Sequence, residues 1–398
     1  MTVERQRWTI LALLCISTAI NYIDRQALSV LLPTLRSDLG ISSVQYGTIT
    51  TAFMLAYTAG QMAAGPLIDR IGTRAGFAIA ICVWSVAAMA HAFARGAASL
   101  TFLRVLLGIG EAGNWPAGGK AIAEWFPKER RAFAMGVFDG GSAAGAILAP
   151  PLVAILALKF GWCATFVATG AIGFVWLAAW LRLYHNPASL QADSGARKRF
   201  SWPRGRRLWG LMVTRMIATP VWWFYVFWLP DYLGKDRGFS LAEIGIFGWI
   251  PFLTVDIGKL AGGALSDYFL HLNWTPTLAR KSVMACGAVA MAGGVQVVGA
   301  GNAAAAIAWV CLATFGFGMW SANILALHAD IFPSESMATA VGWTGTAASL
   351  GGAGFTFAAG WLVERQGYAP IFWAAGTAAL VALLSLIFLV GRVEKHEV

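Results

Sequence analysis

The stretch from Arg104 to Glu124 places charged residues inside a sequence that is otherwise apolar and long enough to cross a bilayer. Arg104 and Glu111 are seven residues apart, nearly two turns of an α-helix, so both side chains point the same way. An ionised side chain in hydrocarbon is costly unless it faces a partner or a water-filled cavity. The pair indicates either a functional site or a permanent ion pair that only joins two helices. We favour a functional site, because charges inside a membrane often line a transport pathway.

Asp24 and Arg25 interrupt the first apolar run of the chain. If the first span runs outward and the fourth runs inward, Asp24 and Arg104 lie at similar depth and could pair where the helices face each other. A carboxylate whose arginine partner comes and goes can bind and release a proton near neutral pH. We therefore predict that Asp24, Glu111 and Arg104 act together in proton coupling.

Arg25 points about 100° away from Asp24 and therefore toward a different partner. It shares a helix face with Asn21 and Ser29. The guanidinium offers a planar fork of donors that suits a carboxylate, and Asn21 and Tyr22 could hydrogen-bond hydroxyl groups. These residues predict a site for a small carboxylic acid with several hydroxyls, with Lys120 as the next candidate for the cation.

The composition places these charges in a membrane protein. The chain has 398 residues, of which 58% are hydrophobic and only 12% are charged, whereas soluble globular chains are about a quarter charged. The net charge of +10 comes from basic residues dispersed among short loops, which is typical of membrane orientation and not of nucleic-acid binding. The five cysteines occur singly in apolar runs, without a metal-binding spacing. We therefore expect no metal, no cofactor and no nucleic-acid partner.

Apolar runs long enough to span a bilayer recur along the chain and predict an all-α integral membrane protein. A polar stretch from Tyr184 to Arg207 separates them into two sets. We therefore divide the chain into an N-terminal half (1–184), a cytoplasmic linker (185–206) and a C-terminal half (207–398). Lys and Arg are concentrated in one set of loops, which places both termini in the cytoplasm. The twelve predicted spans are residues 8–32, 44–67, 75–94, 98–123, 132–157, 161–184, 207–232, 241–265, 279–300, 303–329, 337–362 and 368–391.

The two halves share a sequence repeat. The pattern Asp38-x-Gly40-x-Ser42 recurs 198 residues later as Asp236-x-Gly238-x-Ser240, and Asp69 recurs at the same shift as Asp267. Because six spans return the chain to the side where it started, both halves have the same orientation. Two parallel six-helix halves with a cavity between them are the arrangement of secondary transporters.

The loop Gly65-Pro-Leu-Ile-Asp69-Arg70-Ile-Gly72-Thr-Arg74 resembles the signature loop of the major facilitator superfamily. The segments Asn21–Arg25, Gly110–Asn114 and Trp222–Pro230 resemble, more specifically, the anion:cation symporter family and its bacterial hexuronate transporters. The resemblance implies the twelve-helix fold of that superfamily in the bacterial inner membrane. It also implies proton-coupled uptake, by alternating access, of a hexuronate such as glucuronate or galacturonate. An aldonate such as galactonate is the alternative substrate.

The same resemblance implies site residues. The first-span tyrosine and arginine of the family and its second-span tyrosine match Tyr22, Arg25 and Tyr57. Its Asp/Arg/Glu set matches the three residues predicted above for proton coupling. The eleventh span departs from the family, because it offers Thr344, Thr346 and Ser349 in place of a substrate-binding asparagine. The candidate substrate-binding residues are Asn21, Tyr22, Arg25, Tyr57, Asn114, Tyr225, Trp320, Asn323, Thr346 and Ser349.

Charged residues near the cytoplasmic side form a predicted gate. Those of the signature loop are expected to lock this side in one state without touching the substrate. Lys120 and Glu124 are one helical turn apart, and Asp139, which stands where the family has asparagine, enters the fifth span at comparable depth. These three form either an inner gate or a plain structural network. The predicted gating residues are Asp69, Arg70, Arg74, Lys120, Glu124 and Asp139.

Other polar residues of the spans have weaker assignments. Asp256 and Lys259 are three residues apart and are expected to pair with each other. His328 lies at the end of a span and is expected to be structural, whereas Arg215 has no assignable partner. Tyr57 could equally serve in packing. The tryptophans of the seventh span are expected to pack, and Tyr225 is the best candidate of that span to line the cavity.

Three other functions remain as alternatives. A passive exchanger of the same fold would need no protonatable carboxylate, and Asp24 with Glu111 argues against it. A membrane-embedded enzyme would need a nucleophile–base set or a metal cluster, for which the sequence shows no spacing. A sensor that binds without transporting could keep the same site. We therefore expect a monomeric transporter, not an enzyme, whose partners are protons, a sugar-acid anion and the lipid bilayer.

Overall fold

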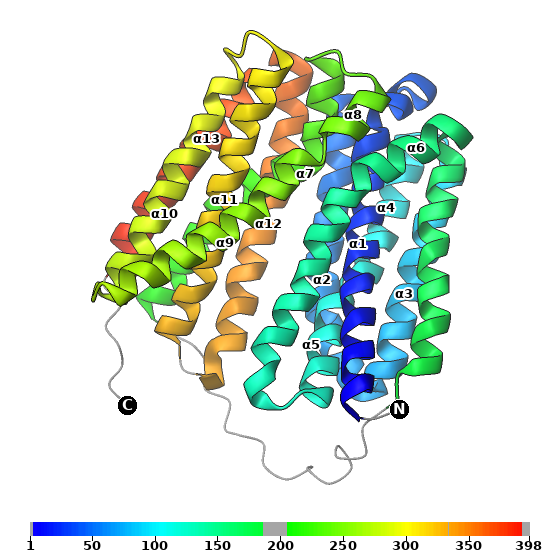
Figure 1. The fold of residues 1–398 in the computed structure, drawn as a ribbon. Helices are drawn as coiled ribbons and strands as arrows, with labels where there is room; N and C mark the ends of the chain where they lie inside the picture. Colours follow the sequence, from blue (N-terminus) through cyan, green and yellow to red (C-terminus); the bar gives the residue numbers. More distant parts are fainter. Residues whose placement is uncertain (1–2, 186–204, 333, 392–398) are drawn as a thin grey trace. The chain divides into compact units, whose positions relative to one another are not determined.

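The computed structural model describes residues 3–185, 205–332 and 334–391 (Figure 1). These residues form helices joined by short turns. Most of the predicted linker, including its basic cluster at 193–199, lies outside the described residues. The helices are α1 (Val3–Leu39), α2 (Ser43–Ile71), α3 (Thr73–Ala90), α4 (Ala97–Glu111), α5 (Asn114–Trp125), α6 (Lys128–Leu183), α7 (Arg206–Lys235), α8 (Leu241–Phe247), α9 (Ile250–His271), α10 (Pro276–Ala292), α11 (Ala303–Ile331), α12 (Ser334–Gln366) and α13 (Ala369–Ser385), with the short helical segments η1 (His91–Phe93), η3 (Gly293–Val297) and η4 (Leu386–Val390).

Some predicted spans are divided in the structure. The predicted fourth span forms α4 and α5, which are separated by a turn at Ala112 and Gly113. The predicted eighth span similarly forms α8 and α9. The predicted fifth and sixth spans both lie within the bounds of α6 and are separated at Gly161, where φ is 81° and the backbone is not helical. Because glycine adopts positive φ without steric cost, Gly161 is where the two helical segments can separate.

The sequence repeat reappears as a repeated turn before a helix. Gly40 and Gly238 both have positive φ, 66° and 70°. Two residues later, Ser42 caps α2 and Ser240 caps α8, each in a capping box with the residue three positions on. In a capping box the serine hydroxyl and the partner side chain satisfy backbone N–H groups that the helix leaves unpaired. The repeat therefore specifies where these two helices begin.

The chain divides into two units, one comprising Met1–Ala196 with Leu233–Trp249 and the other comprising Arg197–Tyr232 with Ile250–Val398. The first unit includes α8, because α8 packs on α6. A Cβ at Gly245 of α8 would lie 2.7 Å from the Ala154 side chain of α6. The helix therefore groups with the first unit through this contact, although it follows the predicted linker in sequence.

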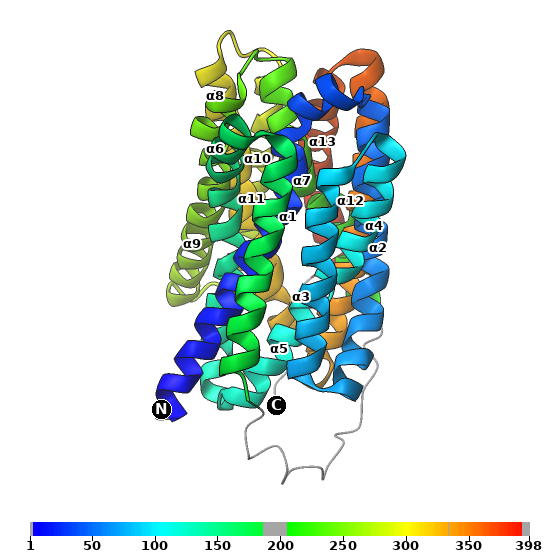
Figure 2. The ribbon, with the colours of Figure 1, turned by 90° about the vertical axis from the view of Figure 1, so that its right-hand side faces the viewer.

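In the first unit, α1 packs against α6, α2 against α4, and α3 against both α4 and α6. The crossing of α1 and α6 is close, since a Cβ at Gly141 would lie 2.1 Å from the carbonyl oxygen of Cys15. Gly145, one turn later, meets the Ala19 carbonyl in the same way at 2.4 Å. Small residues at this spacing let helix backbones approach within a membrane. Figure 2 shows α5 beside the lower part of α3, a contact that continues the α3–α4 packing.

In the second unit, α11 packs against both α9 and α10, and α10 packs against α13. Glycines again mark the close crossings. A Cβ at Gly351 of α12 would lie 2.0 Å from the Met216 carbonyl oxygen of α7, and one at Gly318 of α11 would lie 2.1 Å from the Val255 carbonyl oxygen of α9. The two units thus use the same packing device at their helix crossings.

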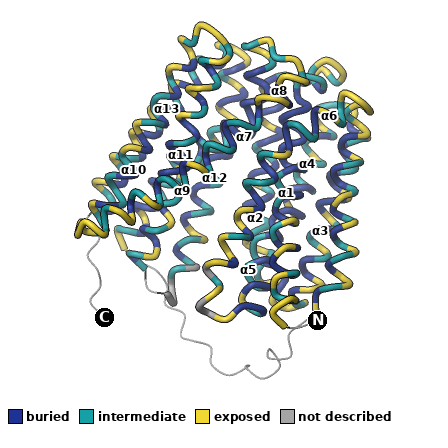
Figure 3. Tube along the Cα trace, viewed as in Figure 1, coloured by how far each residue is buried: buried dark blue, intermediate teal, exposed yellow. Residues whose placement is uncertain are grey.

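Exposed residues recur along the helices, as the yellow stretches of Figure 3 show. Many of these exposed residues are large and apolar. Leu260, Val175 and Phe93 are 76%, 73% and 80% exposed, which is typical of lipid-facing helices and not of a soluble surface. The prediction of twelve spans stays a prediction. Within the described residues, six segments are long and apolar enough to cross a membrane, namely Thr73–Phe93, Phe133–Leu183, Leu241–His271, Ala303–Ile331, Thr339–Gln366 and Ala369–Val390.

Candidate functional site

A buried ion pair joins α1 to α4 in the first unit. Nε and Nη2 of Arg25 both donate to Oε2 of Glu111, at 2.9 and 2.7 Å. The two side chains are 1% and 0% exposed. The second carboxylate oxygen of Glu111 is buried without a hydrogen-bond partner among the described residues. Two N–H donors of Arg25 therefore bind one oxygen of Glu111.

Aromatic rings surround the same guanidinium. Its central carbon lies 4.8 Å from the ring centroids of Tyr22 and Tyr57 and 5.4 Å from that of Phe53. Asn21, one turn before Arg25, accepts a further hydrogen bond from Nη2 at 3.0 Å. Cation–π contacts of this kind contribute most where the cation is desolvated. The predicted substrate-binding residues of α1 and α2 are thus gathered around Arg25.

Arg104 and Asp24 flank this pair without bonding to each other. Arg104 donates from Nη1 to the main-chain carbonyl of Arg25 at 3.0 Å, and its Nε and Nη2 are buried without a partner among the described residues. Neither carboxylate oxygen of Asp24 has a hydrogen-bond partner in the same part of the chain. The nearby Thr169 hydroxyl donates to the Phe166 carbonyl instead.

The expected contact between Asp24 and Arg104 is therefore not formed, and Glu111 pairs with Arg25 instead of sharing Arg104. The reason lies in helix rotation. Asp24 and Arg25 project about 100° apart, so only one of them can face Glu111, and the packing of α1 turns Arg25 toward it. Arg104 then meets the backbone of α1 and not its carboxylate.

Glycines of α4 bring the helices close enough for this arrangement. A Cβ at Gly108 would lie 2.7 Å from the Phe53 carbonyl oxygen of α2, and one at Gly110 would lie 2.6 Å from the main-chain nitrogen of Trp84 in α3. Gly60 of α2 meets Ala112 at 2.8 Å in the same manner. The run of small residues around Glu111 therefore allows α2 and α3 to pack closely on this part of the chain.

Asn114 lies in the first turn of α5 and does not reach Arg25. Its Nδ2 donates to the Thr18 hydroxyl at 3.1 Å, and its Oδ1 accepts from the Ser17 hydroxyl at 3.2 Å. All three side chains are buried. In this structure Asn114 joins α1 to α5.

The candidate substrate-binding residues of the second unit are mostly engaged in packing. Tyr225 is buried against Phe224 and Phe372. Trp320 is buried as well. Asn323 donates to the Gly262 and Met319 carbonyls at 3.1 and 3.0 Å and so ties α11 to α9. Thr346 donates to a carbonyl of its own helix, and Ser349 is half-buried.

A polar network that the sequence left unassigned lies in the second unit. Nη1 of Arg215 donates to the Thr344 hydroxyl at 3.0 Å, and Nε2 of His328 lies 2.9 Å from the same oxygen. Nδ1 of His328 donates to the Ile324 carbonyl. An arginine inside an apolar run was the only sequence signal. Its partners come from α11 and α12, so they could not be assigned from the sequence.

Three of the predicted gating residues, Asp69, Lys120 and Glu124, lie where α5 meets the turn between α2 and α3. Lys120 donates to the Asp69 carboxylate at 2.9 Å and to the Ile68 carbonyl at 3.1 Å. Glu124, one turn further, accepts from the Thr73 hydroxyl at 2.6 Å and from the Tyr184 hydroxyl.

Burial and the contact with Glu124 raise the pKa of Tyr184, so its phenol stays protonated and donates. Arg74 donates to the Leu181 carbonyl, which joins the same turn to the end of α6. Arg70 and Asp139 are exposed. The structure therefore joins Lys120, Glu124 and the signature loop, and leaves their role in gating as a prediction.

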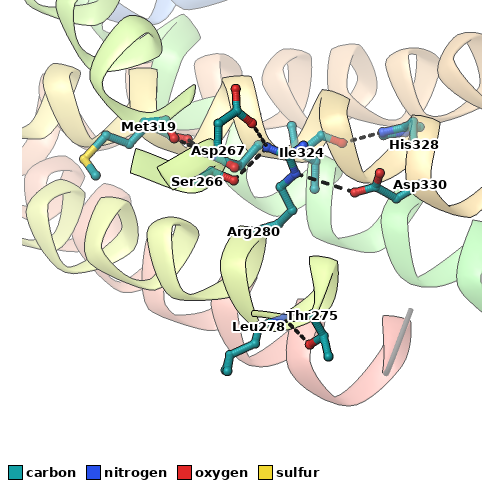
Figure 4. Close-up of polar contacts among 11 residues, drawn as sticks. Ser266, Asp267, Thr275, Leu278, Arg280, Met319, Ile324, His328 and Asp330 are labelled. Carbon is teal, nitrogen blue, oxygen red and sulfur yellow. Dashed lines mark hydrogen bonds and ion pairs between the residues drawn. The ribbon is translucent and has the colours of Figure 1, made fainter. Parts of the chain in front are cut away.

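The second copy of the signature loop has its own ion cluster (Figure 4). Arg280 of α10 donates from Nη1 to the Ser266 hydroxyl at 2.7 Å and to Asp267 at 3.2 Å. Its Nε lies 3.5 Å from Asp330 of α11, on the other side of the guanidinium. Arg280 thus connects three helices.

The expected pair of Asp256 and Lys259 is confirmed, at 3.1 Å. Within the described residues, no group of three or more His, Cys, Asp or Glu side chains is placed to hold a metal ion.

The Major Facilitator Superfamily model matches residues 14–356. The chain belongs to the major facilitator superfamily. This match covers most of the chain, and the superfamily predicted from the loop between the second and third spans is confirmed.

Two relatives of this major facilitator chain are similar over most of their length. The hexuronate transporter of Escherichia coli (strain K12) is 34% identical over 387 residues, which cover 92% of this chain and 90% of that protein. The galacturonate transporter of Dickeya chrysanthemi is 35% identical over 308 residues, or 72% and 89% of the two chains. The crystal structure of a D-xylose-proton symporter is similar with a TM-score of 0.78 at 15% identity, covering 98% and 99%. At that identity the similarity shows the fold alone.

Proposed function

We propose that this protein carries a sugar-acid anion across the bacterial inner membrane together with protons. The observation that supports it most directly is the buried pair of Arg25 and Glu111, a cation suited to a carboxylate held by a group that can be protonated. The two relatives named for hexuronate and galacturonate transport support the substrate class. A hexuronate such as glucuronate or galacturonate is the proposed substrate.

Protonation of Glu111 is the proposed first step. A neutral Glu111 no longer holds Arg25 as an ion pair, so Nε and Nη2 become available to the substrate carboxylate. The substrate anion then replaces the Glu111 charge, and the formal charge of the buried cluster is the same before and after loading. An anion entering alone would add a negative charge to a desolvated site, which is costly. This charge balance is the proposed reason why proton and anion move together.

Asp24 is the proposed site of a second proton. It is buried without a hydrogen-bond partner among the described residues, and binding one proton would remove its uncompensated charge. Moving one negative charge inward opposes an inside-negative potential by about 2.3 kcal/mol per 100 mV. One proton makes uptake of a monoanion electroneutral, whereas two let the potential drive it.

The neutral groups around Arg25 would bind the hydroxyls of the sugar. Asn21 already bonds the guanidinium, and Tyr22 and Tyr57 place their rings on it. We propose that the tyrosine hydroxyls and the Asn21 amide orient the ring once the carboxylate is bound. We propose that the protein is a monomer with twelve spans and both termini in the cytoplasm, and that transport is inward.

Glu111→Gln tests the proposal because a glutamine is permanently neutral. In proteoliposomes this variant should still exchange labelled glucuronate or galacturonate in counterflow, but should not concentrate it when a pH gradient is imposed. Glu364→Gln, which removes an exposed carboxylate of α12, is the matched control and should accumulate substrate as wild type does. Accumulation by Glu111→Gln at the wild-type level would make Glu111 only a structural partner of Arg25.

Wild-type transport of a panel of compounds separates the remaining alternatives. Glucuronate, galacturonate and galactonate distinguish a hexuronate from an aldonate substrate, and glucose should not compete because it offers Arg25 no carboxylate. Equilibration without accumulation under a pH gradient would indicate a passive exchanger. Binding without any flux would indicate a sensor.

A further inference from the structure

The second unit contains one membrane arginine whose charge has no carboxylate partner among the described residues. Arg215 lies nine residues after Arg206, the first residue of α7, or about 14 Å along the helix axis. Its one hydrogen bond within that part of the chain goes to the Thr344 hydroxyl at 3.0 Å. A guanidinium has five N–H donors, so four remain for another acceptor.

These spare donors are accessible. The Arg215 side chain is half-buried, and none of its nitrogens belongs to the buried polar atoms that lack a partner. Arg104 differs, because its two spare nitrogens are sealed inside the first unit. Arg25 differs as well, because Glu111 occupies it. Of these three arginines, Arg215 alone offers an accessible and uncompensated positive charge.

The neighbours of Arg215 hold it in place without neutralising it. A carbonyl can only accept, so the contact with Ile324 shows that Nδ1 of His328 carries a proton. The Thr344 oxygen accepts from Arg215. The single Thr344 hydroxyl proton has three neutral acceptors within reach, namely Nε2 of His328 at 2.9 Å and two carbonyls of its own helix at 2.9 and 3.1 Å. The network orients the guanidinium and adds no negative charge.

We propose that Arg215, positioned by Thr344 and His328, is a carboxylate-binding residue of the second unit. The inference rests on the proposed function, because it takes the ligand to be a sugar acid. A carboxylate would accept two of the free N–H groups side by side, the geometry that arginine provides and lysine does not. It would also compensate the charge of Arg215, which has no carboxylate partner among the described residues.

Two sources of this carboxylate fit the chemistry. It is either the single carboxylate of a uronate or the second carboxylate of a sugar diacid. Binding of D-glucuronate, D-glucarate and D-glucose to the purified full-length protein, measured by isothermal titration calorimetry, separates them. The compounds carry one, two and no carboxylates on the same six-carbon skeleton.

Arg215→Gln removes the charge and is expected to weaken binding about 10- to 100-fold for each acid whose carboxylate meets Arg215. If Arg215→Gln binds both acids more weakly, Arg215 binds the carboxylate that both acids carry. If it binds only D-glucarate more weakly, Arg215 binds the second carboxylate of the diacid. Arg215→Lys should recover only part of the affinity, because the charge remains without the fork. Thr344→Val, which removes the hydroxyl that holds Arg215, should weaken binding less than Arg215→Gln does.

Arg365→Gln is the matched control, because it removes an exposed positive charge from the same unit and should leave both affinities unchanged. Unfolding temperatures of all variants show whether each is folded. Wild-type affinity for both acids in a folded Arg215→Gln protein would overturn the assignment of Arg215 while leaving the proposed function intact. A wild-type protein that binds neither acid would overturn the proposed function and this inference with it.

Discussion

The two units of this protein share a packing scheme but differ in how they treat buried charge. In the first unit, Arg25 and Glu111 form an ion pair that is almost fully buried, with Asp24 and Arg104 close by. In the second unit, Arg215 bonds only neutral partners among the described residues. The helix crossings are alike. A Cβ added at Gly141 would lie 2.1 Å from the Cys15 carbonyl oxygen, and one added at Gly351 would lie 2.0 Å from the Met216 carbonyl oxygen.

The two units therefore share close helix crossings but differ in the partners of their arginines Arg25 and Arg215. Close backbone crossings depend on glycine and tolerate little change, so a duplicated scaffold keeps them. Buried charges are costly unless compensated, so they persist only where they are paired or where they bind something. Arg25 of the first unit is paired with Glu111, which suits proton coupling, whereas Arg215 of the second unit has no carboxylate partner among the described residues, which suits binding an anion.

The largest expected effect separates the two arginines. Arg25→Gln should lower the free energy of unfolding by about 3–5 kcal/mol, because it leaves Glu111 buried without its cation. Arg215→Gln should cost only about 1 kcal/mol, the value of one hydrogen bond to a neutral hydroxyl. Denaturant-induced unfolding of the purified protein in detergent measures both. The double variant Arg25→Gln/Glu111→Gln should recover part of the stability that Arg25→Gln loses. Equal losses of stability in Arg25→Gln and Arg215→Gln would contradict the proposed difference between the two arginines.

A smaller effect tests the shared packing. Gly141→Ala and Gly351→Ala each place a Cβ about 2 Å from a facing carbonyl, so each should cost about 1–3 kcal/mol through overpacking. The same unfolding measurement applies. Gly140→Ala and Gly342→Ala are the controls, because a Cβ at either position meets nothing within 4 Å. If only one of the two variants, Gly141→Ala or Gly351→Ala, loses stability, the two units do not share the dependence on glycine at their helix crossings.

The smallest effect concerns the ion pairs of the signature loop and its second copy. Asp69→Asn breaks the pair with Lys120, and Asp267→Asn breaks the pair with Arg280. Both aspartates are well exposed, so each variant should change stability by less than about 1 kcal/mol. Double-mutant cycles with Lys120→Gln and Arg280→Gln give the coupling energies. A coupling well above that value would mean that either pair is more than a surface contact.

Much of the fold could be predicted because its signals are local. Apolar runs located the helices, and the repeated Gly and Ser residues of Gly40–Ser42 and Gly238–Ser240 appear as left-handed turns and caps. The pairing of Asp256 with Lys259 followed from their spacing on one helix. The predicted boundary between the fifth and sixth spans is confirmed, because the chain leaves helical geometry at Gly161.

The sequence by itself determined that the chain is helical and apolar, which superfamily signature it carries, and which residue types lie within its spans. Only the tertiary structure decided that Glu111 pairs with Arg25 and not with Arg104. Adjacent residues of a helix differ by about 100° in direction, and the rotation of each helix is set by its packing against distant segments. The link from Arg215 to Thr344 spans 129 residues, a contact that no local pattern specifies because folding of the whole unit brings the two helices together.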